Sequence, residues 1–213
     1  MLQISNLTMQ FEDKKVLANI HLHIQDKEKM AIIGSSGSGK TTFFQILSLQ
    51  LKPNSGTIFY QNKNIFHYST HEKHIYKKHI IHTLPQNLLL FENKTVYENL
   101  ELFFNKKEID SILKKHHLDD LKKRKVYTLS GGQKQKVAIL RACLKSCHIY
   151  LLDEITNALD EATAKEVLDF LFSLLKDKTI LIITHQLHLI KPYVQKVYLL
   201  HNGKLKEVLN EAS

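Results

Sequence analysis

A short apolar run, a glycine-rich loop and a helical pattern follow one another near the N-terminus, and this order most constrains the fold. Residues 30–33 predict a strand, and residues 41–51 predict a helix with its phenylalanines on the buried side. Between them lies Gly34-Ser-Ser-Gly-Ser-Gly-Lys-Thr41, which has the G-x-x-x-x-G-K-[ST] spacing of a phosphate-binding loop. A strand, such a loop and a helix in this order predict an α/β protein with a parallel sheet.

Glycine is scarce in the rest of the chain. The sequence contains 7 glycines, where average usage would give about 15, and most of them lie in this loop or at residues 131–132. Glycine lets backbone N–H groups turn toward an anion, and the N-terminus of the helix adds partial positive charge. We therefore expect the loop to bind a nucleoside triphosphate through Gly34, Ser35, Ser36, Gly37, Ser38, Gly39, Lys40, Thr41 and Thr42.

The residue types inside this loop suggest separate tasks. Lys40 is expected to reach the β- and γ-phosphates, and the Thr41 hydroxyl is expected to bind Mg²⁺. Two carboxylates, Asp153 and Glu154, follow a second apolar run at residues 149–152. A buried strand places both at its carboxyl end, where open α/β sheets bind ligands. We expect Asp153 to hold Mg²⁺ and Glu154 to orient or deprotonate an attacking water.

Further patterns extend the α/β prediction along the chain. Strands are expected at residues 2–7, 20–24, 57–60, 80–84 and 179–183, a helix at 161–175 and a hairpin turn at 202–203. Residues 95–125 are different: they are helical in pattern and rich in lysine, and they begin with a capping box at Thr95. This stretch predicts a helical subdomain inserted into the α/β core.

Residues 129–133, Leu-Ser-Gly-Gly-Gln, begin a further predicted helix that continues to about Lys145. Ser130 and Gln133 have the spacing of a capping box, and a serine-capped helix start flanked by glycines is an anion site. One P-loop holds one triphosphate, so a second site of this kind suggests a shared arrangement. The spacing leaves open whether this site acts on the nucleotide of a partner chain.

Over essentially the whole chain, these motifs resemble the ATP-binding cassette (ABC) family. Residues 129–133 match the family signature letter for letter, after a P-loop and before the carboxylates at 153–154. Four single residues match further family motifs. Phe11 matches the aromatic residue that stacks on adenine, and Gln86 matches the Q-loop. Asp160, within Asn-Ala-Leu-Asp, matches the D-loop, and His185 matches the switch histidine.

The resemblance implies a fold and an assembly. The implied fold class is α/β: a P-loop NTPase (RecA-like) core with an antiparallel β subdomain and an inserted α-helical signature subdomain. The helical subdomain would cover about residues 87–145 of a single nucleotide-binding domain, 1–213. Two such cassettes, identical or different, would form a head-to-tail dimer around two ATP molecules. Each ATP would lie between Lys40 of one chain and the signature of the other, namely Ser130, Gly131, Gly132 and Gln133.

The resemblance also implies roles for three single residues. Gln86 would sense Mg²⁺ and couple the site to a membrane subunit. His185 would contact the γ-phosphate, and Asp160 would link the two nucleotide sites.

Three positions depart from the family pattern. Lys27 replaces a glycine before Glu28, Ile155 replaces the proline after the catalytic glutamate, and Lys136 replaces an arginine after the signature. Because none of these changes removes a catalytic group, we expect an active ATPase.

Charge, cysteine and histidine add little to this interpretation. The net charge is +9, and the most basic segment, residues 105–125, has hydrophobic residues at helical spacing. Its lysines therefore favour a solvated helix face over an anionic membrane surface or nucleic acid. Cys143 and Cys147, four apart on a predicted helix, favour reduced thiols over a redox pair or a metal site. His71 and His74 are spaced one residue short of the zincin motif, which argues against a metal site there.

Three functional hypotheses follow. The first is the ATP-binding, ATP-hydrolysing subunit of an ABC transporter with separate transmembrane permease subunits. The second is a soluble ABC ATPase that acts in cofactor assembly or on nucleic acid or ribosomes, and the third is a non-hydrolysing regulatory cassette. The N-terminus lacks a secretory signal pattern and no apolar run is long enough to span a bilayer. We expect a cytoplasmic protein, peripheral on the inner face of the cell membrane, with ATP and Mg²⁺ as cofactors and no nucleic-acid partner.

Overall fold

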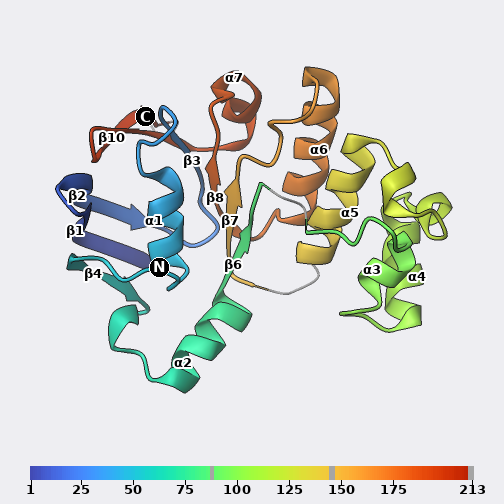
Figure 1. Cartoon of the computed structure of the whole chain (residues 1–213), viewed down its shortest axis with the longest axis horizontal. Coiled ribbons are helices and arrows are strands. Elements are labelled where there is room, and N and C mark those ends of the chain that lie inside the picture. Colours follow the sequence, from blue (N-terminus) through green and yellow to red (C-terminus); the bar gives the residue numbers. More distant parts are fainter. Residues whose placement is uncertain (87–88, 144–146, 211–213) are drawn as a thin grey trace.

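Two sheets, with helices between and beside them, make up the computed structural model of this chain (Figure 1). The structure describes residues 1–86, 89–143 and 147–210. The ends of the expected helical subdomain, at residues 87–88 and 144–146, lie outside the described residues, as does the predicted helix end at Lys145.

An antiparallel sheet is formed mainly by the N-terminal part of the chain. Its strands are β1 (Leu2–Phe11), β2 (Lys14–Ile24), β4 (Ser55–Tyr60) and β5 (Lys63–Asn64), in the order β2-β1-β4-β5. The alternating pattern predicted for β1 and β2 is confirmed, because Leu2, Ile4 and Leu7 are buried while their neighbours are more exposed. Both strands are longer than predicted, and β1 extends to Phe11.

A mostly parallel sheet forms the centre of the molecule. Its strands are β3 (Lys29–Ile33), β6 (Ile81–Leu84), β7 (Ile149–Asp153), β8 (Thr179–Ile183), β9 (Lys196–His201) and β10 (Lys204–Asn210). The order is β10-β9-β3-β8-β7-β6, and only the β9–β10 hairpin is antiparallel. Because β3 and β7 are parallel and separated only by β8, the loops after them meet at one edge of the sheet.

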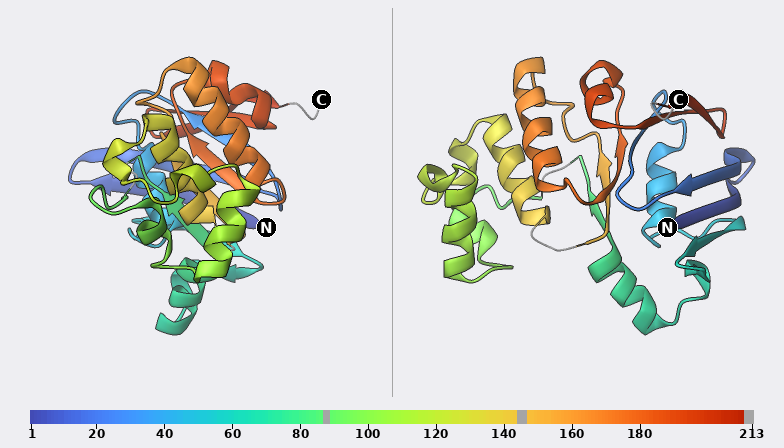
Figure 2. Two further views of the ribbon diagram at one scale, coloured as in Figure 1. Left: turned by 90° about the vertical axis from the view of Figure 1, so that its right-hand side faces the viewer. Right: turned by 180° about the vertical axis from the view of Figure 1, so that it is seen from behind.

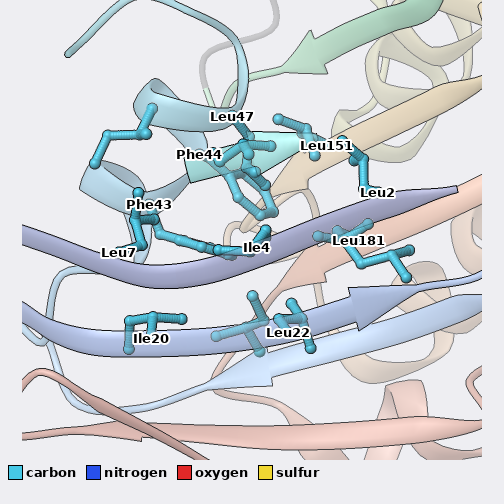
Figure 3. Packing of buried hydrophobic residues seen from close by; sticks show 14 of the residues in the cluster. Leu2, Ile4, Leu7, Ile20, Leu22, Phe43, Phe44, Leu47, Leu151 and Leu181 are labelled. Atoms are coloured by element: carbon cyan, nitrogen blue, oxygen red, sulfur yellow. The ribbon is translucent and has the colours of Figure 1, made fainter. Parts of the chain in front are cut away.

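The central strands are apolar on both faces because both faces are covered. Ile149 and Leu151 of β7 join the core that contains α1 (Lys40–Leu47) and the antiparallel sheet (Figure 3). Tyr150 and Leu152 point to the other face and join a second core. That core contains α6 (Glu161–Leu174), α7 (Leu187–Ile190) and part of α5 (Gly131–Cys143).

A third hydrophobic cluster holds the helical part of the chain together. It joins α5 to α3 (Val96–Leu100), α4 (Lys106–Lys115) and the 3₁₀ turn Asp119–Leu121. A further 3₁₀ turn, Val126–Thr128, precedes α5. The predicted capping box at Thr95 is present, with a second at Asn105. From behind, the helical part and the antiparallel sheet lie at opposite ends of the molecule (Figure 2).

The segment between β5 and β6 is irregular. It contains the 3₁₀ turn Ile65–His67, α2 (Thr70–Ile75) and a π-helical turn, Tyr76–Ile80. Elsewhere in the chain, a 3₁₀ turn, Lys191–Tyr193, follows α7.

Within the described residues, no group of three or more histidine, cysteine, aspartate or glutamate side chains is placed to hold a metal ion.

Two helix predictions need correction. Helix α1 ends at Leu47 rather than at residue 51, because Leu49 adopts a left-handed backbone with φ +57° that stops the helix. Cys147 does not lie on a helix: it follows the described part of α5 (Gly131–Cys143) and is buried just before β7. The two cysteines are not joined by a disulfide, and burial raises the pKa of the Cys143 thiol to about 12.

The turn that leads into β3 contains the first departure from the family pattern. Lys27 adopts a left-handed backbone with φ +61°, a conformation that glycine adopts without the steric cost of a side chain. Its backbone N–H donates a hydrogen bond to Thr179 Oγ1, N···O 2.8 Å, which fixes the turn against β8.

Candidate functional site

The P-loop wraps around the N-terminus of α1. Gly37 and Gly39 have φ values of +74° and +103°, which favour glycine. A side chain at Gly39 would also collide with Val16, since a Cβ atom there would lie 2.8 Å from Val16 Cγ1. The two glycines thus allow the loop to turn back under β2 and direct its backbone toward one cavity.

Lys40 is held inside this loop. Its ammonium group donates hydrogen bonds to the carbonyl oxygens of Gly34 and Ser35, at 2.8 and 2.9 Å. The side chain is buried with only 6% of its surface exposed. A buried ammonium requires hydrogen-bond acceptors, and these two carbonyl groups hold its charge at the centre of the loop.

Thr41 and Asp153 meet across the edge of the sheet, as the sequence predicts for the ends of parallel strands. The Thr41 hydroxyl donates to Asp153 Oδ2 at 3.3 Å. Partial burial raises the pKa of Asp153 above its ordinary value, and the neighbouring Glu154 adds to this, while Thr41 and Lys40 act in the opposite direction. The site therefore favours a positive charge next to this carboxylate.

Glu154 begins the loop after β7. Its backbone is left-handed, with φ +49°, and its N–H donates to the Ile183 carbonyl at 3.0 Å. Its carboxylate accepts a hydrogen bond from the side-chain amide of Asn157. The other oxygen, Oε1, lies 4.0 Å from His185 Nδ1, which places the predicted switch histidine beside the predicted base.

One cavity of about 460 Å³ brings together many of the predicted site residues, but Gly34, Ser35, Ser38 and His185 are not among the residues that line it. Phe11 lies at its rim with 45% of its surface exposed. Gln86, which follows β6, also lines it. The full lining is Phe11, Val16, Ser36, Gly37, Gly39, Lys40, Thr41, Thr42, Gln86, Asp153 and Glu154.

Sequence reasoning missed two residues of this neighbourhood. Val16 lines the cavity from β2, but its apolar type is equally typical of any half-buried strand. Asn157 was noted only as part of a four-residue motif, and nothing in that spacing indicates a contact with Glu154. Both contacts depend on tertiary structure.

The signature residues do not line this cavity. Ser130 Oγ accepts a hydrogen bond from Gln133 N–H at 3.2 Å, and Gln133 Oε1 accepts from Ser130 N–H at 3.1 Å, so the predicted capping box is present. Gly132 packs against α6, because a Cβ atom there would lie 2.5 Å from Thr163 Cγ2. A glycine is needed at this position for the start of α5 to approach α6.

Asp160 belongs to the same contact. It is the N-cap of α6 and accepts hydrogen bonds from the backbone and side chain of Thr163, at 3.0 and 2.6 Å. These hydrogen bonds hold the pKa of Asp160 below its ordinary value. The residues whose side chains approach Gly131 and Gly132 are Leu159, which precedes Asp160, and Thr163, which Asp160 caps. Asp160 is not among the residues that line the P-loop cavity of its own chain.

The donor set beside the P-loop fits a magnesium ion. Thr41 and Asp153 present oxygen atoms, and Mg²⁺ prefers one or two protein oxygens together with phosphate and water oxygens. Gln86 adds an amide oxygen on the same cavity. No sulfur or imidazole ligand is among these residues, so the chemistry is that of a hard divalent cation.

A parallel sheet, a P-loop at the end of β3 and two acidic residues at the end of β7 define a P-loop nucleotide-binding protein. The family model described as ABC transporter matches residues 17–157 of this chain. Curated relatives agree with that match. The chain therefore belongs to the ABC transporter family, in the class of its ATP-binding cassettes.

Two curated relatives illustrate the similarity. The arginine transport ATP-binding protein ArtM of Bacillus subtilis (strain 168) is 36% identical over a 218-residue alignment that covers 97% of this chain and 90% of ArtM. The methionine import ATP-binding protein MetN of Legionella pneumophila (strain Lens) is 33% identical over 97% of this chain. The chain spans 64% of the length of that MetN protein.

Solved structures share the fold over nearly the whole chain. The dimeric structure of MJ0796, a bacterial ABC transporter cassette, matches with a TM-score of 0.84 and 27% identity. The alignment covers 100% of this chain and 100% of the MJ0796 chain. cbiO1 from Clostridium perfringens, part of the ABC transporter complex cbiONQ, has a TM-score of 0.82 and 28% identity, over 96% of this chain and 86% of cbiO1. The α/β fold class is thereby confirmed.

Across the described ranges 1–86, 89–143 and 147–210, no helix has the length and apolar character needed to cross a membrane.

Proposed function

We propose that this chain is the ATP-binding and ATP-hydrolysing subunit of an ABC transporter. It would be one nucleotide-binding domain over residues 1–213, with a helical subdomain at about 87–145. Lys40, Thr41, Asp153 and Glu154 all line one cavity of about 460 Å³, and this arrangement is the main support for the proposal. This cavity sets a cation and a hydroxyl opposite two carboxylates, the groups that phosphoryl transfer to water needs.

In this proposal, the phosphates of ATP replace the Gly34 and Ser35 carbonyl oxygens as partners of Lys40. The lysine then balances charge on the β- and γ-phosphates, and P-loop N–H groups hold the phosphate oxygens. A water molecule attacks the γ-phosphorus and gives a proton to Glu154. The bond between the γ-phosphorus and the bridging oxygen breaks, and the electron pair leaves with ADP.

The remaining site residues position the reacting groups. His185 would contact the γ-phosphate from beside Glu154, and Phe11 would stack on the adenine at the rim of the cavity. Thr41, Asp153 and Gln86 would hold Mg²⁺, which, when bound, neutralises charge on the transferring phosphoryl group. The donor oxygens on these residues support that assignment.

The site would be completed by a second cassette, identical or different. Ser130, Gly131, Gly132 and Gln133 lie outside the P-loop cavity of their own chain, yet they form a capped, glycine-flanked helix start that suits an anion. A two-fold dimer would place this helix start over the partner's P-loop, and the reverse contact follows from symmetry. Asp160, which caps the helix that packs against Gly132, would link the two sites. The dimeric structure of the MJ0796 cassette supports this assembly.

A groove beside the helical part supports a separate membrane subunit as partner. It has a volume of about 300 Å³ and is lined from β6, the segment after it and α5, with Leu84, Leu89, Phe91, Phe103, Ala138 and Ala142 among its apolar residues. Leu89 and Phe91 are 68% and 53% exposed, and clustered exposed apolar residues mark interaction sites. Gln86 lies on the nucleotide cavity, and Leu89, three positions later in the sequence, lies on the groove, so the two proposed sites are close along the chain.

The transported substrate would pass through separate membrane subunits, with this chain on the cytoplasmic, inner face of the membrane. The similarity to a methionine import protein and an arginine transport protein supports transport of a small molecule. That cbiO1 is part of a cbiONQ complex supports separate partner chains. If the chain instead purifies without any membrane partner and acts on a soluble complex, the alternative of a non-transport ABC ATPase holds.

Steady-state hydrolysis of MgATP tests the proposed reaction. The wild-type protein should release phosphate, and E154Q should lower kcat by about 10²–10⁴-fold, the typical contribution of a general base. ATP binding should persist in this variant, because the proposal assigns the phosphates to Lys40 and the P-loop and not to Glu154. Wild-type turnover in E154Q would overturn the role of Glu154, and absence of turnover in the wild-type protein with its membrane partner would support a regulatory cassette.

A further inference from the structure

Asn157 contacts the proposed base but has no part in the proposed reaction. Its Nδ2 donates a hydrogen bond to Oε2 of Glu154. Its backbone N–H also donates to the Glu154 carbonyl, N···O 3.2 Å. The main chain and the side chain of Asn157 therefore close the same turn on Glu154, after the end of β7.

The surroundings of this turn fix Asn157 but not the Glu154 carboxylate. The Glu154 backbone is left-handed and bonded to β8. The buried Thr156 hydroxyl lies 3.0 Å from Gln186 Oε1, which ties the turn to the loop that holds His185. Beyond its backbone, however, Glu154 has three rotatable side-chain bonds. Among the described residues, Asn157 contacts one oxygen of this carboxylate and His185 lies near the other.

The orientation of the amide indicates that it serves the carboxylate. An ionised carboxylate only accepts hydrogen bonds, so the NH₂ group of Asn157 must face it. This orientation leaves Asn157 Oδ1 buried without a hydrogen-bond partner in the described part of the chain. A buried acceptor without a donor lowers stability, so a gain in folding stability does not explain why an asparagine occupies this position. The hydrogen bond from its amide to Glu154 explains it.

We propose that Asn157 is a positioning residue for the hydrolysis reaction. It holds the Glu154 carboxylate in the orientation that receives a proton from the attacking water, and it touches neither the nucleotide nor that water. This inference rests on the proposed role of Glu154 as base. It predicts that Asn157 acts on the rate of the chemical step and not on ATP binding.

The first test is the kinetics of N157A in the full-length protein. Loss of a hydrogen bond to a charged group should lower kcat about 10- to 100-fold, while KM for ATP stays within about twofold. The melting temperature should not fall, because the variant also removes a buried, unpaired acceptor. A matched control is A158G, which loosens the same turn but keeps the amide, and it should retain nearly the wild-type kcat. An unchanged kcat in N157A, or an equal loss in A158G, would overturn the inference.

A double-mutant cycle tests whether Asn157 acts through Glu154. E154D shortens the side chain by one methylene, which withdraws the carboxylate from the Asn157 amide. N157A should therefore lower kcat in the wild-type background but change it less than about twofold in the E154D background. Equal losses in both backgrounds would mean that Asn157 acts independently of Glu154.

The same cycle separates this inference from the proposed function. If E154D and E154Q both hydrolyse ATP at the wild-type rate, the proposed role of Glu154 fails. If both are slow and N157A is as fast as the wild type, only the role of Asn157 fails.

Discussion

The ammonium group of Lys40 donates a hydrogen bond to the carbonyl oxygen of Gly34, the first residue of the P-loop, at 2.8 Å. The loop thus binds its own lysine at the point where the proposed function places the β- and γ-phosphates. A phosphate oxygen that enters replaces a neutral acceptor with a charged one, which strengthens the hydrogen bond. This replacement of a carbonyl oxygen by a phosphate oxygen as the partner of Lys40 is the physical basis of the proposed ATP binding.

Replacement of Lys40 by alanine should weaken MgATP binding by about 100-fold or more, since one charge-assisted hydrogen bond alone contributes about 1.5–3 kcal/mol. Isothermal titration of the nucleotide measures this directly. T8A, on the antiparallel sheet, serves as a control and should bind like the wild type. An unchanged dissociation constant in K40A would contradict the placement of the phosphates.

Replacement of Asp153 by asparagine should have opposite effects on stability and on binding. The pKa of Asp153 is raised above its ordinary value of 3.8, so the ionised carboxylate destabilises the fold near neutral pH. D153N removes that penalty and should therefore raise Tm. It should also weaken the Mg²⁺-dependent part of ATP binding.

The pH dependence gives this prediction a sign that can be checked. The penalty of wild-type Asp153 disappears as the pH falls through its folded-state pKa, because the group is then neutral in the folded protein. The Tm advantage of D153N should therefore shrink at acidic pH. An advantage that grows as the pH falls would contradict the raised pKa.

Replacement of Lys27 by glycine should stabilise the protein. Lys27 has φ +61°, a backbone that costs a side-chain-bearing residue about 1–2 kcal/mol, whereas the greater freedom of glycine in the unfolded chain offsets up to about 1 kcal/mol. The ion pair of Lys27 with Asp177 is long, at 4.0 Å, and exposed, so its loss should matter little. The net gain should be about 0.5–1 kcal/mol in urea unfolding. K14G, in strand β2 at a position without positive φ, should instead destabilise.

Replacement of Phe91 by alanine should weaken capture of the membrane subunit at the groove. Phe91 is held in place through its backbone, which pairs with the Asn99 side chain, so truncation removes exposed apolar area without removing those hydrogen bonds. We expect about 10-fold weaker association, or more, for loss of a buried aromatic contact. V208A, an exposed apolar position on β10, is the control. Equal capture of F91A and V208A would exclude the groove as the docking site.

Local pattern predicted the core of the fold well, for a physical reason. Glycine spacing and buried apolar runs encode strands that end at a common edge, so the approach of Thr41 to Asp153 followed from the sequence. The early end of α1 could not be predicted, because it depends on the left-handed backbone at Leu49. The contact of Asn157 with Glu154 likewise depends on the turn between β7 and α6, and the conformation of this turn depends on the whole fold and not on the local sequence.

The most direct test of the central claim is to mix two inactive variants. K40A loses its P-loop function but keeps its signature, and S130R blocks its signature but keeps its P-loop. If each nucleotide is shared between Lys40 of one chain and Ser130 of the other, a mixed dimer contains one intact site. Equal mixing should then restore about one quarter of wild-type ATP hydrolysis. A mixture as inactive as its two components, from proteins that are folded and form dimers, would contradict the shared site.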